Sequence, residues 1–320
     1  MWSKRSVFYA TRSTDMRNGF HWIRWIIVTT QSSRPITTSG FPGPRRHHDG
    51  DDVTLTVARL VALCDELEQT DLRPAPEVDA AFGELVGLCC HPPTGDTARV
   101  LEQIAPHADR LRELSSTGEG RMEQHWAARI AAAADPVAEL DLFPYLGNYH
   151  DLVRLELASL DAVGVPAPRR AVVLGSGPLP LTGLVLAARH GAEVVHVDRD
   201  ADAARAGDAV ATALGIPART LVADVTAAVP DPGLDAELAQ ADVVLVGALV
   251  GADAPEKRAL TTRLAEAAPG ATLLVRTAAG LRTLLYPEVT AADLPDLDVL
   301  LEVHPWTDVV NSVLVARGGR

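Results

Sequence analysis

The stretch AVVLGSGPLPLTGLVLAARHGAEVVHVD, at residues 171–198, constrains the fold of this chain more than any other part of the sequence. An apolar run ends in a turn that contains Gly175 and Gly177, a helical pattern follows, and a second apolar run ends in Asp198. Strand, glycine turn, helix, strand and acid, in this order, open the parallel sheets that bind nucleotides. The two glycines allow a tight turn and a close approach of the backbone to a ligand. We therefore expect Asp198 to accept hydrogen bonds from the hydroxyls of a ribose.

Pro180 distinguishes between the ligands that such a turn can hold. It stands where a dinucleotide-binding turn has its third glycine, on which the helix packs closely beneath a pyrophosphate. A proline instead suits the first turn of a helix, where its missing N–H leaves no hydrogen bond unmade. The turn of Gly175, Ser176, Gly177 and Pro178 therefore fits S-adenosylmethionine better than NAD. A βαβ crossover that binds no ligand is the alternative.

Apolar runs and helical patterns continue to alternate up to the end of the chain. Three further runs are typical of parallel strands and end near Asp224, Gly247 and Arg276. The runs LDVLLEVHP and SVLVARG then resemble the antiparallel last strands of a methyltransferase-type sheet. We therefore predict an α/β fold with a Rossmann-like sheet of the class I S-adenosylmethionine-dependent methyltransferase type, preceded by an α-helical bundle domain.

The ends of the later strands supply further candidates for the binding site. Ligands of such sheets lie outside the carboxyl ends of the strands, so Asp224, Ala248, Leu249 and Arg276 should line the same mouth as the glycine turn. The carboxylate of Asp224 is placed to accept a hydrogen bond from the amino group of an adenine. Arg276 can hold a substrate carboxylate in a bidentate pair, and a salt bridge within the protein is the alternative.

The first half of the chain follows a different pattern. Residues 1–51 are rich in arginine and poor in apolar periodicity, which indicates a disordered extension. Residues 52–142 repeat apolar positions at helical spacing, which predicts a domain of about four or five helices. An aromatic, turn-rich junction and a linking helix follow at residues 143–168, before the sheet domain at residues 169–320. A junction between two domains commonly forms one wall of a cleft.

The composition restricts the partners and the compartment. A net charge of −13 argues against nucleic acid and anionic membranes as partners, and no apolar segment is long enough to span a bilayer. Cys64, Cys89 and Cys90 show no disulfide or zinc spacing, which favours free thiols in a reducing cytoplasm. No metal-ligand spacing is present. We therefore expect a cytoplasmic, metal-free protein that acts on a small molecule, and a homodimer is compatible with the sequence.

Motifs along most of the chain resemble the nicotianamine synthase family, including its bacterial relatives that build opine-type metallophores. The glycine turn reads GSGPLPLT at residues 175–182, and VRTAAGLRTLLYP and HPWTDVVNSV follow at residues 275–287 and 304–313. Upstream, EGRMEQH lies at residues 119–125 and FPYLGNYHDLVRLE at residues 143–156. The order and spacing of these pieces make a chance similarity improbable.

The resemblance implies transfer of the 3-amino-3-carboxypropyl group of S-adenosylmethionine to an amine, with release of 5′-methylthioadenosine. Plant-type members condense three cofactor molecules into nicotianamine, and bacterial relatives often make a single transfer to an amino acid such as histidine. In the family, a glutamate of the helical domain and a tyrosine of the junction serve the reacting centre. By motif, these positions fall on Glu123 and Tyr149.

Transfer of a group from a sulfonium to an amine requires a base near the sulfonium. An amine attacks only when it is neutral, so a carboxylate whose pKa is raised by burial suits the task of taking its proton. We assign this role to Glu123, with a solvated glutamate on a helix face as the alternative. Tyr149 could hydrogen-bond the acceptor amine or orient the migrating arm, and Tyr145 could do the same or only pack. Glu84 could bind a cationic group of the substrate, with a structural hydrogen bond as its alternative.

Three other functions stay open at this point: a small-molecule N-methyltransferase, an NAD-dependent oxidoreductase, and a ligand-binding protein without catalysis. Methyl transfer would leave S-adenosylhomocysteine instead of methylthioadenosine, so the products discriminate. Pro180 disfavours NAD, and the presence of both Glu123 and Tyr149 argues against a protein without catalysis. Asp308 and Asn311 are expected to be structural and to hold the end of the sheet.

Overall fold

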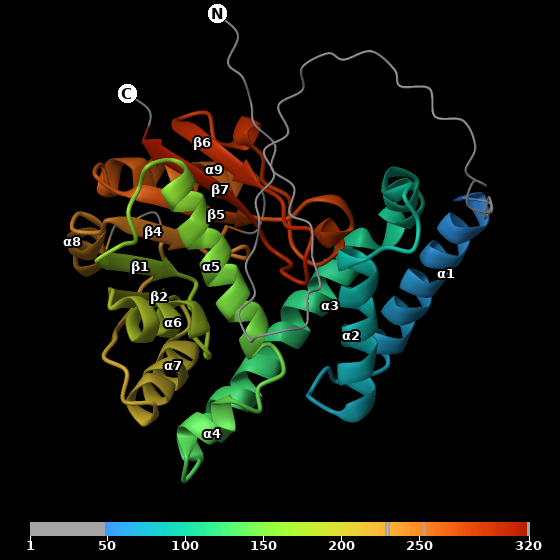
Figure 1. Cartoon of the computed structure of the whole chain (residues 1–320), viewed down its shortest axis with the longest axis horizontal. Helices are drawn as coiled ribbons and strands as arrows, with labels where there is room; N and C mark the ends of the chain where they lie inside the picture. The colour runs from blue at the N-terminus through green and yellow to red at the C-terminus, as the bar shows by residue number, and fades with distance from the viewer. Residues whose placement is uncertain (1–48, 228, 230, 252–253, 319–320) are drawn as a thin grey trace, which may run out of the picture.

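The computed structural model describes residues 49–227, 229, 231–251 and 254–318 (Figure 1). The disordered extension predicted for residues 1–51 therefore lies outside the described residues, apart from its last three positions. Those three belong to the first helix, α1, which begins at Asp49.

One mixed sheet of seven strands dominates the second half of the described chain, in the order β3-β2-β1-β4-β5-β7-β6 (Figure 1). The strands β1 to β5 pair in parallel, and β7 is antiparallel to both β5 and β6. This order confirms the predicted methyltransferase-type sheet, with the chain reversing its direction of travel between β1 and β4. The strands are β1 (Arg170–Leu174), β2 (Glu193–Asp198), β3 (Arg219–Val222), β4 (Val243–Val246), β5 (Thr272–Thr277), β6 (Leu297–Val303) and β7 (Ser312–Gly318).

Helices cover both faces of the sheet. One face packs on α8 and α9, and the other packs on α5 and α6. Along β1, Val172 and Leu174 point into the first of these cores, and Ala171 and Val173 point into the second. Strands buried on both faces explain why they read as continuous apolar runs in the sequence. These helices are α5 (Leu146–Ala162), α6 (Leu181–His190), α7 (Ala201–Ala213), α8 (Pro232–Leu238) and α9 (Ala254–Ala267).

A helical region precedes the sheet, as predicted. It consists of α1 (Asp49–Glu68), α2 (Pro76–Cys90), α3 (Thr97–Ala132) and α4 (Pro136–Leu140). α1, α2 and the first half of α3 share one apolar core with the short 3-10 helix η1 (Gly280–Leu284), which follows β5. Over the described ranges, no helix combines the length and the apolar character that crossing a membrane requires.

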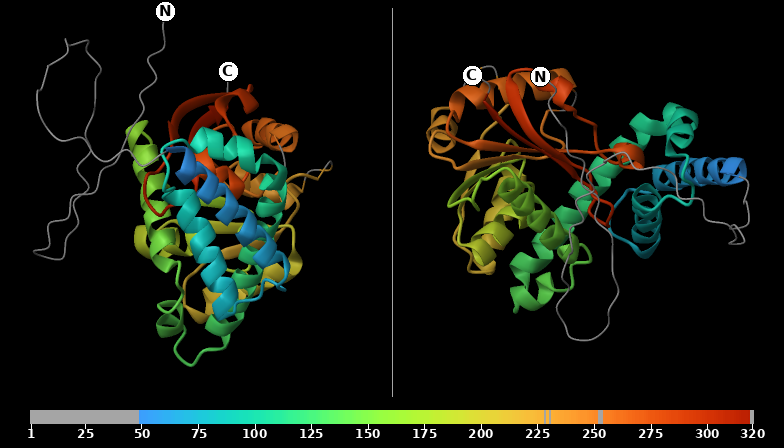
Figure 2. Two further views of the ribbon diagram at one scale, coloured as in Figure 1. Left: turned by 90° about the vertical axis from the view of Figure 1, so that its right-hand side faces the viewer. Right: turned by 45° about the horizontal axis from the view of Figure 1, so that its top comes forward.

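α3 connects the helical region to the sheet. It runs unbroken through Pro106 and through the weak helix formers at residues 115–118. Its first half buries Ile104 and Leu111 against α1 and α2, and its last turns bury Ile130 against α6 and α7. Packing at both ends therefore overrides the local propensity. Figure 2 shows α3 crossing from the α1 side of the molecule to the sheet side.

Candidate active site

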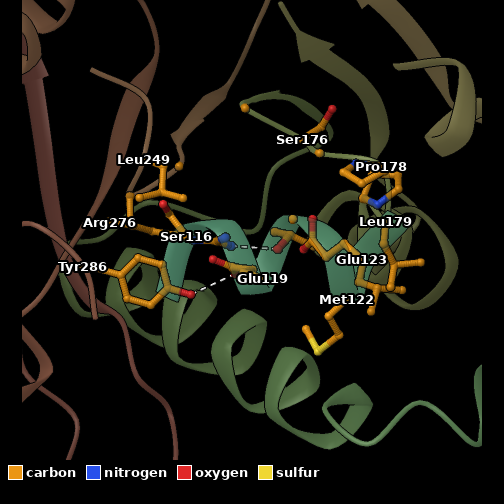
Figure 3. A pocket seen from close by; sticks show the side chains of 18 of the residues that line it. Ser116, Glu119, Met122, Glu123, Ser176, Pro178, Leu179, Leu249, Arg276 and Tyr286 are labelled. Carbon is orange, nitrogen blue, oxygen red and sulfur yellow. Dashed lines mark hydrogen bonds between the residues drawn. The ribbon is translucent and has the colours of Figure 1, made fainter. Parts of the chain in front are cut away.

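A cavity of about 800 Å³ opens where α3 and α5 meet the carboxyl ends of the parallel strands (Figure 3). This volume is typical of small-molecule sites. All but one of the site residues predicted from the sequence line it: Glu123, Tyr145, Tyr149, Gly175, Ser176, Gly177, Pro178, Asp198, Asp224, Ala248, Leu249 and Arg276. Among the described residues, no group of three or more histidines, cysteines and carboxylates is arranged to hold a metal ion.

The glycine turn is held by the strand beside it. The N–H groups of Gly175 and Ser176 both donate to the carbonyl of Val197, at 2.9 and 3.1 Å. The N–H of Gly177 donates to Oδ2 of Asp198 at 2.8 Å. Asp198 therefore fixes the turn and also faces the cavity, and its contact with a ribose stays a prediction.

Close packing between helix and strand, which a third glycine provides in dinucleotide-binding turns, occurs here at Gly183. A Cβ atom at this position would lie 2.0 Å from Nε2 of His196 on β2. Burial lowers the pKa of His196 to about 4, so its ring is neutral at this contact. Pro180 is the residue immediately before α6, so the proline does not interrupt the helix.

Glu123 reaches the glycine turn from α3. Its Oε1 accepts a hydrogen bond of 2.8 Å from the hydroxyl of Tyr149, and its Oε2 lies against the backbone of Gly177. Burial raises the pKa of Glu123 well above its ordinary value, and the negative charge of Glu119 raises it further. Burial and the neighbouring glutamate also raise the pKa of Tyr149, so its hydroxyl stays a donor. The helical region thus presents a carboxylate to the mouth of the sheet.

We expect Gly177→Ala to push these two groups apart. The added Cβ would lie 2.7 Å from Oε2 of Glu123, and φ at this position is +67°. A left-handed φ costs a residue other than glycine about 1–2 kcal/mol. If Glu123 serves as the predicted base, the transfer activity expected from the family resemblance should fall about 10- to 100-fold, as measured by initial rates, because small misplacements of a catalytic group are costly.

Gly164→Ala is the matched control for this variant. Gly164 also has a left-handed φ, +75°, but a Cβ there would meet no atom within 4 Å. The control carries the same backbone strain without the contact to Glu123, so it should retain its activity. An equal loss in both variants would mean that strain, and not the displaced carboxylate, is responsible.

A second carboxylate, Glu119, lies one helical turn before Glu123 on the same face of α3. Its Oε1 accepts a hydrogen bond of 2.8 Å from the hydroxyl of Tyr286, which follows η1 (Figure 3). Burial raises the pKa of Glu119 as well. The sequence prediction missed this pair, although both residues stand in the motifs that carry the family resemblance. The spacing of the two glutamates in EGRMEQH was the available signal.

Arg276 faces the same cavity from the end of β5, but its guanidinium is already engaged. Nε donates to Oε1 of Glu156 at 2.7 Å, and a terminal nitrogen donates to Oγ1 of Thr182 at 2.7 Å. The Glu156 side chain is only 2% exposed, which makes this a buried ion pair. The structure therefore shows the internal salt bridge that was the alternative, and a contact of Arg276 with a substrate carboxylate stays a prediction.

The part of the cavity beside Asp224 and the loop after β4 is lined by both polar and apolar groups. Oδ1 of Asp224 accepts hydrogen bonds from the N–H and the hydroxyl of Thr226, at 2.9 and 2.6 Å, and these lower the pKa of the carboxyl group. Ala248 is buried, and Leu249 is 47% exposed beside it. Polar and apolar walls of this kind suit the edge and the face of an adenine ring.

The sequence prediction also missed Lys257, which holds the loop that carries Ala248. Its side chain is fully buried, and Nζ donates to the carbonyls of Gly247 and Ala248, at 3.2 and 3.1 Å, and to that of Val250. Burial lowers the pKa of this lysine to about 8. The ammonium group of Lys257 thus holds three carbonyls of the loop at residues 247–250 by hydrogen bonds.

Two expectations need correction. Glu84 does not line the cavity: on the outside of α2, its two oxygens accept hydrogen bonds of 2.6 and 2.7 Å from Arg59 of α1. Glu84 therefore binds the guanidinium of Arg59 and not a cationic group of the substrate. Asn311, expected to be structural, lines the cavity together with Asp308. The Asn311 side chain is 9% exposed, and its Nδ2 has no hydrogen-bond partner among the described residues.

Comparison with known protein families gives a match over most of the chain. Residues 49–320 match a family model described as nicotianamine synthase protein. The chain is 40% identical to nicotianamine synthase 3 of Oryza sativa subsp. japonica over 254 residues, which is 77% of this chain and 73% of that one. It is 41% identical to nicotianamine synthase 9 of Hordeum vulgare over 272 residues, 82% and 77% of the two chains. It is 34% identical to nicotianamine synthase 1 of Arabidopsis thaliana over 272 residues, 82% and 84%.

Solved structures share the fold. A crystal structure of MtNAS in complex with MTA and tNA has a TM-score of 0.70 and 21% identity, and covers 86% of this chain and 99% of that one. A glutamate-to-glutamine variant of MtNAS in complex with S-adenosylmethionine also has a TM-score of 0.70 and 21% identity, with 82% and 98% covered. The helical region and the sheet are thus arranged similarly in both proteins.

Proposed function

The chain belongs to the nicotianamine synthase family, whose enzymes transfer the aminocarboxypropyl group of S-adenosylmethionine, and we propose that Glu123 is the general base of this transfer. One observation carries the proposal: the carboxylate of Glu123 lies against Gly177 of the glycine turn and is held there by Tyr149. Burial raises the pKa of Glu123 well above its ordinary value, which makes its carboxylate a stronger base than an exposed one. We further propose that residues 52–142 supply this base and that residues 169–320 bind the cofactor.

The residues present fit S-adenosylmethionine. The turn leaves no room for a side chain at Gly177, so a ligand there meets backbone. We propose that Asp198 binds the ribose, and that Asp224, Ala248 and Leu249 surround the adenine. The carboxylates of α3 then face the positive charge of the sulfonium. A solved structure with the same fold, that of an MtNAS variant, is a complex with S-adenosylmethionine, which supports the choice of this ligand.

In the proposed step, Glu123 takes a proton from the acceptor amine, and the freed nitrogen forms a bond to the methylene carbon next to sulfur. The C–S bond breaks with its electron pair going to sulfur, which leaves methylthioadenosine as a neutral thioether. The nitrogen must approach in line with that bond, at about 3–3.5 Å, which distinguishes this transfer from methylation. Tyr149 donates to Oε1 and so keeps Oε2 turned toward the reacting groups.

We propose that the acceptor is an amine derived from S-adenosylmethionine itself, that the product is nicotianamine, and that the enzyme serves metallophore biosynthesis in the cytoplasm. The similarity to plant nicotianamine synthases over more than three quarters of the chain supports this choice. A single transfer to an amino acid such as histidine is the alternative.

Mass spectrometry of the products tests both statements. The enzyme is incubated with S-adenosylmethionine alone and, in parallel, with added histidine. We expect methylthioadenosine in both reactions and nicotianamine in the first. An aminocarboxypropyl adduct found only with histidine would show that the acceptor is an amino acid. S-adenosylhomocysteine in place of methylthioadenosine would contradict aminocarboxypropyl transfer.

Asp198→Ala should mainly weaken the binding of the cofactor. Hydrogen bonds to a charged group contribute about 1.5–3 kcal/mol, so the dissociation constant measured by calorimetry should rise about 10- to 100-fold. Asp198→Asn keeps an acceptor for the N–H of Gly177 and so separates the ribose contact from a loosened turn. Asp208→Ala, on the exposed side of α7, is the control. An unchanged dissociation constant in both Asp198 variants would contradict the ribose role.

A further inference from the structure

The Glu119–Tyr286 pair repeats the arrangement of Glu123 and Tyr149 one helical turn away. In each pair, a tyrosine hydroxyl donates to Oε1 of the glutamate at 2.8 Å. In neither pair does any described residue donate a hydrogen bond to Oε2, and both glutamates line the cavity. The transfer step proposed above uses only one of the two carboxylates. The other is therefore available to a ligand.

The charges at the inner end of the cavity favour a cationic ligand. The carboxylates of Glu119 and Glu123 line the cavity there beside Arg276, whose own guanidinium is paired with Glu156. Burial raises the pKa of both glutamates on α3, and a positive charge beside them would favour their ionised forms. A sulfonium compensates one of the two remaining negative charges. A protonated amino group of the acceptor compensates the other.

The spacing of the two carboxylates matches a particular acceptor. The Cβ atoms of residues at positions i and i+4 of a helix, here Glu119 and Glu123, lie about 5–6 Å apart. Two nitrogens joined by three carbon atoms span about 5 Å when the chain is extended, by standard bond lengths. Each transferred aminocarboxypropyl arm creates this arrangement, because its own amino group stands three carbons from the nitrogen to which the arm is attached.

The rest of the cavity wall suits such an acceptor. Val78, Phe82 and Val86 of α2 form an apolar side against which methylene groups can pack. Nδ2 of Asn311, buried and without a hydrogen-bond partner in the described part of the chain, can donate to a carboxylate. It lies next to the end of β5, since Ser312 pairs with Thr277 across the sheet.

We propose that Glu119 and Tyr286 bind a second, protonated amino group of the acceptor, three carbons away from the nitrogen that attacks, while Glu123 deprotonates the first. This inference rests on the proposed function. It makes Glu119 a specificity-determining residue, which favours acceptors that already carry an aminocarboxypropyl arm and so favours repeated transfer. Glu119 differs from Glu123 in lying one turn farther from the glycine turn, beside Tyr286 and not against Gly177.

Two small acceptors that differ by one amino group test the proposal. L-2,4-Diaminobutyrate has two nitrogens separated by three carbons, and L-2-aminobutyrate lacks the second nitrogen. Each is given to the enzyme with S-adenosylmethionine, and its aminocarboxypropyl adduct is quantified by mass spectrometry. The wild type should use the diamine with a kcat/KM higher by about 10-fold or more, the size expected for one charged hydrogen bond.

Variants of Glu119 and Tyr286 test whether these two residues cause the preference for the diamine. Glu119→Gln should raise KM for the diamine and bring the two acceptors within about 2- to 3-fold of each other, with KM for S-adenosylmethionine nearly unchanged. Tyr286→Phe should reduce the preference in part, and Glu119→Asp should restore part of it. Glu102→Gln, the same exchange at an exposed position of α3, should behave as the wild type does.

The result that overturns the proposal is a wild type that uses both acceptors equally well, or uses neither although it makes methylthioadenosine. A Glu119→Gln variant that loses kcat equally with both acceptors, at constant KM, would also overturn it. Failure of the proposed function is separate from these results, because a wild type without the transfer activity forms no methylthioadenosine from S-adenosylmethionine alone.

Discussion

Replacement of Glu123 by glutamine is expected to slow aminocarboxypropyl transfer about 10²- to 10⁴-fold, the range that a positioned general base contributes. Glutamine has the same shape, and its carbonyl oxygen can still accept the hydrogen bond from Tyr149, but it cannot take a proton from the acceptor. Binding of S-adenosylmethionine should change little, since the proposed ribose and adenine contacts involve Asp198 and Asp224 and not Glu123. Single-turnover rates and calorimetry measure the two effects separately.

Glu102→Gln again serves as the control, since Glu102 is exposed on the same helix. Full turnover by Glu123→Gln would remove Glu123 from the mechanism. A large loss of affinity for S-adenosylmethionine, with the single-turnover rate intact, would instead make Glu123 a binding residue for the sulfonium.

The pH dependence of the wild type follows from the same carboxylate. Glu123 acts as a base only when ionised, and burial together with Glu119 raises its pKa, so kcat/KM should fall as the pH drops through this raised value. In Glu123→Gln the part of the profile that belongs to the carboxylate should disappear. A variant profile identical to that of the wild type would assign this part to another group.

The sheet was predictable from the sequence because its signals are local. The turn between β1 and α6 is specified by Gly175 and Gly177, and each parallel strand is a short apolar run because both of its faces are buried. Placing Asp198, Asp224 and Arg276 at one mouth required only the rule that ligands lie beyond the carboxyl ends of parallel strands. The continuity of α3 was less predictable, since helix propensity is weak at residues 115–118 and packing at its ends decides the outcome.

Side-chain partners were not predictable, because they join distant parts of the sequence. Tyr286 donates to Glu119 across 167 positions, and the Arg276–Glu156 pair spans 120. No periodicity relates such positions, and only the fold brings them together. Glu84 shows the reverse case, since the sequence allowed a contact with a cationic group of the substrate, whereas Arg59 on the neighbouring helix occupies both of its oxygens.

The buried ion pair behind the cavity leads to the largest expected loss of stability. Glu156→Ala would leave the guanidinium of Arg276, whose side chain is 14% exposed, without its partner. Removal of one member of a buried pair costs about 3–5 kcal/mol, and we expect the lower end, because the carboxylates of Glu119 and Glu123 also face Arg276 and offset part of its charge. Urea unfolding, followed by circular dichroism, measures the change in the free energy of unfolding.

A double variant distinguishes the cost of an unpaired charge from the cost of lost packing. Glu156→Leu combined with Arg276→Met replaces both charges by apolar groups, so it should recover much of the stability that Glu156→Ala loses. Asp161→Ala, at an exposed position of α5, should change the free energy of unfolding by less than about 0.5 kcal/mol. If the single and the double variant are destabilised equally, the unpaired charge of Arg276 is not the cause of the loss.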